Sequence, residues 1–397
     1  MLPILTIAAG CYVLYTILIA IYHLYWNSLA HIPCRKTWVI FPISKQIASL
    51  RGKLDSEIRQ MHLDHGPIIR LGPRELSFTT AQAWADIYGF GHPQLPKTRR
   101  SPLNEVHNII SADDANHARF RKAMSHAFSE KALRDQEILM TRYIDLLIEK
   151  LGDIAVTGLK TDMVKWYNYT TFDLIGDLAF GQSFECLVNS QTHFWVENIL
   201  RFVRTGALLR VGYEYPNLLR IIQLFMSSKS REIRKAQFAW TKETVLNRIN
   251  NKNLQGRKDF MESMLRYKGH ELELNESELI SNSNILVLAG SETTATLLCG
   301  VTYYLSKNYR ILKRATDEVR AQFEHEEEIT FTTATAKLPY MLACLNEALR
   351  RYPPFPGTMT RTTLAGDPTT ISGIDVPAYV SLPHSGGNGS SFTSPTC

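Results

Sequence analysis

The stretch Leu286–Leu298, "LVLAGSETTATLL", has apolar ends and a polar centre. "NESE" places Asn275 at a helix N-cap with Glu278 three residues on, which is a capping arrangement. A helix from there to about Ser306 is predicted to span roughly 45 Å, enough to cross a large domain. A helix that buries its ends buries its centre too, so Glu292 needs a partner, water or a proton.

Small and hydroxyl-bearing residues surround this carboxylate. Gly290 inside a helix costs up to about 1 kcal/mol against alanine. Thr293 and Thr294 can bond back to carbonyls one turn earlier. Together with Ala289, these residues indicate something lying against the helix, with a small-residue gap and a proton-carrying pair beside it. On spacing alone, a solvated polar patch on a partly exposed helix is the alternative.

A second helix is predicted to begin at Pro339 and to stop before the Pro353–Pro354 pair. Within it, Glu347 and Arg350 are three residues apart and therefore neighbours on one face. The pair could be buried by the surrounding leucines, or it could be an ordinary exposed ion pair of small energetic value.

Two patterns place cations where they could hold an anion. In "HARFRK", His117 and Arg121 are four residues apart on one helix face, with Arg119 and Lys122 adding positive charge. The alternative is a solvated basic face. "PPFPGTMTR" is a proline-rich turn that ends at Arg361 and could aim that side chain, unless it is merely a turn.

The N-terminal segment 1–34 contains no Asp, Glu, Lys or Arg. Its run of about 25 apolar or weakly polar residues can cross a bilayer core of roughly 30 Å. Tyr22, Tyr25 and Trp26 suit an interfacial belt, and the basic residues after Cys34 place the rest of the chain in the cytosol. A cleaved signal peptide and a buried helix are the alternatives.

The remaining composition excludes several classes of function. With 44 Lys and Arg against 38 Asp and Glu among 397 residues, the net charge of +6 is too weak to argue for nucleic acid. The six cysteines show no C-x-x-C spacing, so neither a zinc site nor a disulfide framework is indicated. Residues 113–269 are predicted to be mainly helical, and a small sheet is predicted to assemble from segments near 68–80 and 360–382.

The order of these patterns resembles the cytochrome P-450 monooxygenases. Ala289 to Thr294 resembles their oxygen-helix signature, Ala/Gly-Gly-x-Asp/Glu-Thr-Thr, and the Glu347 and Arg350 pair resembles their Glu-x-x-Arg helix. The turn to Arg361 resembles their Pro-x-x-x-Arg region. The resemblance implies a mainly α fold with small β-sheets. It divides the chain into a transmembrane anchor at 1–34, a cytochrome P-450-like domain at 35–384, and a flexible tail at 385–397.

The resemblance also implies a function and roles for the candidate residues. The family oxidises small apolar molecules with a heme, using electrons from NADPH through NADPH-cytochrome P-450 reductase. The "GPIIRLGPRELSF" stretch is most similar to fungal members of secondary metabolism, which are single-pass proteins of the endoplasmic reticulum membrane. The implied roles are room for dioxygen and substrate at Ala289 and Gly290, proton relay during O–O cleavage by Glu292 and Thr293, propionate binding by His117, Arg121 and Arg361, and a structural lock at Glu347 and Arg350.

One element of the family pattern does not occur in the sequence. The cysteine that ligates heme iron lies in Phe-x-x-Gly-x-x-x-Cys-x-Gly, and "GNGSSFTSPTC", which ends at Cys397, does not fit it. No residue is therefore assigned as the iron ligand. We expect the domain to be incomplete after about His384 and the chain as written to be inactive. The alternative function is a non-catalytic, membrane-anchored remnant or binding protein.

Overall fold

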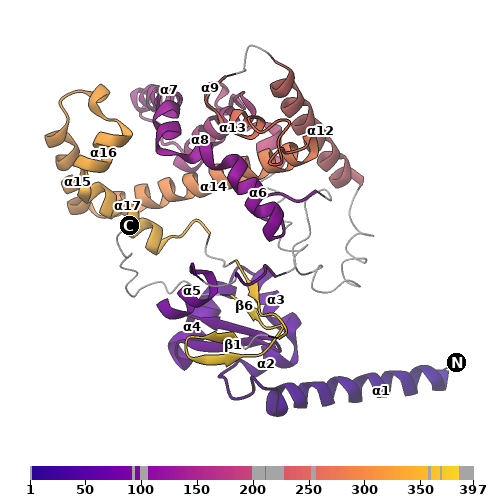
Figure 1. Cartoon of the computed structure of the whole chain (residues 1–397). Helices are drawn as coiled ribbons and strands as arrows, with labels where there is room; N and C mark the ends of the chain where they lie inside the picture. The colour runs from indigo at the N-terminus through magenta and orange to yellow at the C-terminus, as the bar shows by residue number, and fades with distance from the viewer. Residues whose placement is uncertain are drawn as a thin grey trace. The chain divides into compact units, whose positions relative to one another are not determined.

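A computed structural model describes residues 2–91, 94–98, 106–198, 211, 228–251, 256–355, 359–366 and 369–383. The chain forms two compact units, both drawn in Figure 1. The first contains residues 1–100, 207–214 and 355–397, and the second contains residues 101–206 and 215–354. The tail predicted at 385–397 lies outside the described residues.

The second unit is built from helices in its described part, as predicted. Its longer helices are α6 Asp114–Ser125, α7 Glu130–Thr157, α8 Met163–Phe180, α12 Ser228–Asn250, α14 Glu276–Lys307, α15 Tyr309–Gln322 and α17 Pro339–Arg351. Its shorter ones are η3 His126–Phe128, α9 Cys186–Asn189, α13 Phe260–Leu265, η5 Glu326–Glu328 and α16 Phe331–Lys337. The predicted start of α17 at Pro339 is confirmed.

Helix α14 is the long element of this unit and runs across it in Figure 1. The predicted capping box is present: the Asn275 side chain accepts from the Glu278 N–H at 2.9 Å, and the Glu278 carboxylate accepts from the Asn275 N–H at 2.9 Å. The helix packs along α8. Toward its C-terminal end, Thr302 Oγ1 and Tyr167 Oη of α8 form a hydrogen bond of 2.7 Å.

Helix α8 is buried along most of its length, and two of its buried side chains are acidic. The Asp173 carboxylate accepts the N–H groups of Cys186 and Leu187 at 3.0 and 2.8 Å, which fixes the start of α9. The Asp177 carboxylate accepts from Tyr143 Oη of α7 at 3.0 Å and forms an ion pair with Arg257. Helix α8 therefore joins its neighbours through polar bonds as well as apolar packing.

The first unit contains the small sheet predicted from segments 68–80 and 360–382, together with a two-stranded hairpin. Strands β1 Ile68–Gly72, β2 Glu75–Phe78, β6 Ser381–Leu382 and β3 Arg361–Thr362 form one sheet in the order β1-β2-β6-β3, with β2 and β6 parallel. Strands β4 Thr369–Ile371 and β5 Ile374–Val376 form a hairpin. Ser372 and Gly373 have φ of 50° and 81°, as a two-residue hairpin turn requires.

The helices of the first unit precede and follow β1 and β2. They are α1 Leu2–Ile21, the π-helical η1 Tyr22–Trp26, α2 Lys36–Ile40, α3 Pro42–Leu50, α4 Leu54–His65 and α5 Ala81–Tyr88. Among the described residues, the one helix that is long and apolar enough to span a membrane is α14, with a third of its apolar window buried. Residues 10–26 form a shorter apolar helix. The anchor at 1–34 stays a prediction.

The capping box of α14 makes a measurable contribution to stability. We predict that Asn275→Ala lowers the free energy of unfolding by about 1 kcal/mol, because the N–H of Glu278 loses its side-chain acceptor. Asn275→Ser should keep most of that stability, because serine is a comparable N-cap. Denaturant unfolding of the two variants checks this, and equal losses in both would show that the cap is not the cause.

Candidate functional site

The middle of α14 has two faces of opposite character. Ser291 and Ala295 are buried, whereas Ala289, Thr293 and Thr294 are exposed. Glu292 is half-buried between them. The polar signature therefore occupies the boundary between the core of the unit and an open face of the helix.

The hydroxyl groups of this segment bond to the helix itself, as predicted for the threonines. Thr293 Oγ1 donates to the carbonyl of Ala289 at 2.7 Å, and Thr294 Oγ1 donates to the carbonyl of Gly290 at 3.0 Å. The buried Ser291 does the same toward Val287 at 2.7 Å. Each hydroxyl hydrogen is thus satisfied locally, and the oxygen of Thr293 keeps a lone pair on the exposed side.

Gly290 lies where α14 comes closest to α8. A Cβ placed on Gly290 would come within 2.7 Å of Ile175 Cδ1 and 2.9 Å of Ile175 Cγ1. The absent side chain therefore lets α8 approach α14, and its space is taken by Ile175. Sequence reasoning did not find this partner, since nothing local to Gly290 points to a residue so distant in the chain. The role of Gly290 beside dioxygen stays a prediction.

Glu292 is the titratable group of the segment. Burial raises the pKa of its carboxyl above the ordinary glutamate value. Within the described residues, its carboxylate makes no hydrogen bond or ion pair. A carboxyl that is partly desolvated and not committed to a cation is suited to hold and release a proton.

Helix α6 carries two of the three predicted propionate ligands. His117 is half-buried and Arg121 is exposed, one turn apart on this helix. The nearby Arg119 is not available as an additional cation, contrary to the sequence analysis. Its guanidinium is paired with Glu278 and also donates to the Glu273 carbonyl at 2.7 Å. This pairing raises the pKa of Arg119 and ties α6 to the first turn of α14.

Arg361 lies on β3 in the first unit, with a relative exposure of only 7%. Its Nη1 donates to the Leu95 carbonyl at 3.2 Å, and its guanidinium carbon is 5.9 Å from the centre of the Tyr88 ring. Its buried Nε has no hydrogen-bond partner. A buried guanidinium with an unused N–H fits a carboxylate such as a heme propionate. Because Arg361 and the α6 pair belong to different units, they are described separately.

The Glu-x-x-Arg pair on α17 is formed and exposed. Arg350 donates from Nε and Nη2 to the two carboxylate oxygens of Glu347 at 2.7 and 2.6 Å. The pair lowers the pKa of Glu347, yet the two side chains are 51% and 40% exposed. The surrounding leucines therefore do not bury the pair, and its structural role stays a prediction.

The cysteines offer no iron ligand that matches the pattern of the family as Arg361 matches a heme carboxylate. The five cysteines in the described part of the chain are unpaired. Burial raises the pKa of the Cys186 thiol to about 12 and also raises the pKa values of Cys299 and Cys344. None of these three cysteines lies in a Phe-x-x-Gly-x-x-x-Cys-x-Gly stretch, which is the pattern of the family's iron ligand. Cys397 lies outside the described residues.

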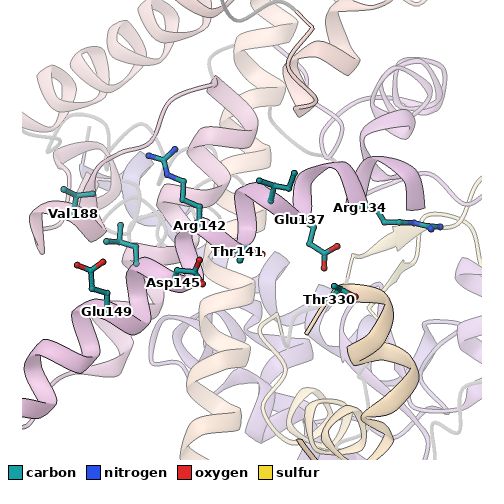
Figure 2. A pocket seen from close by; sticks show the side chains of 10 residues that line it. Arg134, Glu137, Thr141, Arg142, Asp145, Glu149, Val188 and Thr330 are labelled. Carbon is teal, nitrogen blue, oxygen red and sulfur yellow. The ribbon is translucent and has the colours of Figure 1, made fainter. Parts of the chain in front are cut away.

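A groove of about 850 Å³ lies away from α14. It follows α7 between Val188 of α9 and Thr330, the residue before α16, as Figure 2 shows. Arg134, Glu137 and Arg142 of α7 line it with both signs of charge. Such a mixed and open surface has none of the converging polar groups expected of a substrate site.

Comparisons with known proteins decide the family. The model of the family described as cytochrome P-450 matches residues 32–381. The chain belongs to the cytochrome P-450 family. Cytochrome P-450 monooxygenase olcB of Penicillium canescens is 46% identical over 377 residues, which are 95% of this chain and 76% of that protein. The trichothecene C-4 hydroxylase of Trichoderma arundinaceum is 45% identical over 90% of this chain and 71% of its own.

A third relative is less similar and is also named as a hydroxylase. The averantin hydroxylase of Dothistroma septosporum is 34% identical over 93% of this chain and 70% of its own. Cytochrome P-450 membership makes the chain an oxidoreductase of the monooxygenase type. It also implies a heme iron, a redox partner that supplies electrons, and a small-molecule substrate. The fold and family inferred from the sequence are thereby confirmed.

The raised pKa of Glu292 has a consequence for stability. A carboxyl whose pKa is higher in the folded than in the unfolded chain stabilises the fold below its unfolded pKa of about 4.3, and this contribution is lost as pH rises through the folded value. We predict that Glu292→Gln is more stable than the parent at neutral pH and that the difference vanishes in acid. Thermal unfolding across pH checks this, and a difference independent of pH would contradict it.

Proposed function

We propose that this cytochrome P-450 hydroxylates a small apolar metabolite in a fungal secondary pathway. The names of the relatives support this: one is a trichothecene C-4 hydroxylase and another is an averantin hydroxylase. The observation that carries the proposal is the pair on α14, in which a half-buried carboxyl with a raised pKa precedes an outward threonine hydroxyl. The substrate is an oxidisable carbon skeleton of the size that such enzymes accept.

The two residues of this pair have distinct parts in proton transfer. The heme, when bound, supplies the iron chemistry that activates dioxygen. Burial raises the pKa of the Glu292 carboxyl, which makes it a better proton carrier than an exposed glutamate. Thr293 accepts a proton at Oγ1 and releases its own hydroxyl proton, which in the structure forms the hydrogen bond to the Ala289 carbonyl. The pair thereby connects the half-buried side of α14 with its exposed face, where Ala289 leaves room for a substrate.

The cations have complementary parts. Arg361 offers a buried guanidinium with an unused N–H for a heme carboxylate, and we propose the same ligand for His117 and Arg121. The bidentate pair of Glu347 and Arg350 joins two successive turns of α17.

The redox partner is NADPH-cytochrome P-450 reductase, in our proposal. Lys122 is exposed on α6 and forms no ion pair in the described part of the chain. Exposed cations of this kind suit an acidic partner surface, which speeds association more than it tightens binding. Arg119 is excluded from this surface by its bond to Glu278.

The chain is anchored in the endoplasmic reticulum membrane by residues 1–34 and has its body in the cytosol. Tyr12, Leu14 and Leu18 of α1 are exposed by 69, 58 and 56%, as lipid-facing side chains would be. The aromatic end of this segment and the basic residues after it give the orientation.

The heme proposal is tested by spectroscopy. We predict that the 397-residue chain does not give the reduced carbon-monoxide band after which the family is named, because none of its cysteines lies in a Phe-x-x-Gly-x-x-x-Cys-x-Gly stretch. Joining a Phe-x-x-Gly-x-x-x-Cys-x-Gly segment of the family type after His384 should restore the band and NADPH-dependent hydroxylation. A band from the unextended chain would reveal another thiolate ligand, and failure of the extended chain would favour a non-catalytic binding protein.

The proton-transfer proposal is tested in the same extended chain. Thr293→Val removes the hydroxyl, and we expect the hydroxylated product formed per NADPH to fall by about tenfold or more, since positioned proton transfer typically contributes about a hundredfold or more. Thr293→Ser keeps the hydroxyl and should retain most of the product. Equal coupling in the two variants would remove Thr293 from the relay.

A further inference from the structure

Helix α6 carries its cations on two opposite flanks. Arg119 is two residues from His117 and two from Arg121, which is about 200° of rotation around the helix axis in each direction. The buried stripe that includes Phe120 and Ala123 lies between these flanks. Because all of these side chains belong to one rigid helix, a rotation of α6 about its axis would move Arg119 and the proposed carboxylate ligands together.

The guanidinium of Arg119 fastens one of these flanks to α14. Its Nη1 donates to the Glu273 carbonyl at 2.7 Å and to Glu278 Oε2 at 3.1 Å. Its Nη2 donates to the other carboxylate oxygen of Glu278 and to Asn116 Oδ1 at 3.0 Å. The side chains of Arg119 and Glu278 are only 22 and 15% exposed. A bidentate pair with this degree of burial holds its geometry better than an exposed ion pair does.

The segment that leads into α6 is fastened to the same part of α14. Asn282 is fully buried, and its Oδ1 accepts the N–H of Ile109 at 2.8 Å. Ser281 Oγ donates to the Val106 carbonyl at 3.1 Å. Asp113 then caps the N-terminus of α6. The first turns of α14 therefore hold both the entry to α6 and its middle, which fixes the position of the helix along its axis and its rotation about that axis.

We propose that the Arg119–Glu278 pair sets the rotation of α6 that turns His117 and Arg121 toward a heme carboxylate. Arg119 and Glu278 are positioning residues, which hold the helix without touching the ligand. The inference rests on the role proposed above for His117 and Arg121. Charge alone predicts the opposite effect, because Arg119 without its anionic partner would add an uncompensated cation and attract a carboxylate more strongly. A substitution that removes only the charge of Glu278 therefore separates positioning from charge.

Hydrogen exchange in the 397-residue chain tests the hold on α6. Glu278→Gln removes the charged partner of Arg119 and keeps the capping box, because glutamine also serves at this position. Glu276→Gln is the matched control, since Glu276 lies on the same turn of α14 but pairs with Lys242 of α12 at 3.6 Å. We expect the α6 amides to exchange about tenfold faster in Glu278→Gln and at the parent rate in Glu276→Gln. An unchanged rate in Glu278→Gln would overturn the proposal.

Titration of the heme-free extended chain tests the consequence for the ligand. The two ligands are heme and heme dimethyl ester, whose carboxylates are blocked, and binding is followed by absorbance. Glu278→Gln should bind heme about tenfold more weakly than the parent, because donors to a charged carboxylate are misplaced, and should bind the ester as the parent does. Glu276→Gln should bind both ligands as the parent does. Equal weakening toward both ligands would indicate a general structural loss, and tighter heme binding would show that charge outweighs position. Either result would overturn the proposal.

The outcomes also separate this inference from the proposed function. A parent that binds the ester as tightly as heme, or that binds neither ligand, would refute the carboxylate role of His117 and Arg121 and the positioning role with it. A preference for heme that Glu278→Gln abolishes would support the positioning role even if the parent hydroxylates nothing, and the proposed function alone would then fail. Arg119→Gln combined with Glu278→Gln should weaken heme binding no more than Arg119→Gln alone, because both break one pair. Additive losses would overturn the pair as the positioning unit.

Discussion

The close packing of α14 against α8 is the constraint on which the rest of the second unit depends. At Gly290 the two helices approach until Ile175 fills the place of a side chain. Close to this contact Ser291 is buried and Glu292 is half-buried, while Thr293 stays on the open face. Burial raises the pKa of the Glu292 carboxyl, with no neighbouring anion among its causes.

Helix α8 can serve as this partner because its own polar groups are satisfied. Asp173 is fully buried and has a raised pKa caused by burial, but two N–H groups at the start of α9 stabilise its charged form. Asp177 is held by Tyr143 and Arg257. Removing one partner of such a buried group costs more than the pair contributes, because the remaining charge is left unpaired. The same bonds that position α8 would therefore make its movement away from α14 costly.

The sequence was sufficient wherever the signal is local. The start of α14 at its capping box and the start of α17 at Pro339 each follow from neighbouring residues. It was insufficient where a partner lies far along the chain. The pairing of Arg119 with Glu278 could not be read from either segment, so Arg119 was taken as free positive charge. The exposure of Glu347 and Arg350 depends on which elements pack against α17, which their spacing does not contain.

Helix α14 also shows why hydropathy alone cannot separate a core helix from a membrane span. It is long and apolar enough to pass as a span, although its centre carries a carboxyl and three hydroxyl groups. The hydroxyls do not need tertiary partners, because each donates to a carbonyl one turn earlier. Thr293 can consequently face a ligand with its donor already satisfied and its oxygen lone pair available, while Glu292 alone carries the cost of desolvation. The fold therefore tolerates a polar centre in an apolar helix, and the proposed proton transfer needs no tertiary partner for the hydroxyl groups.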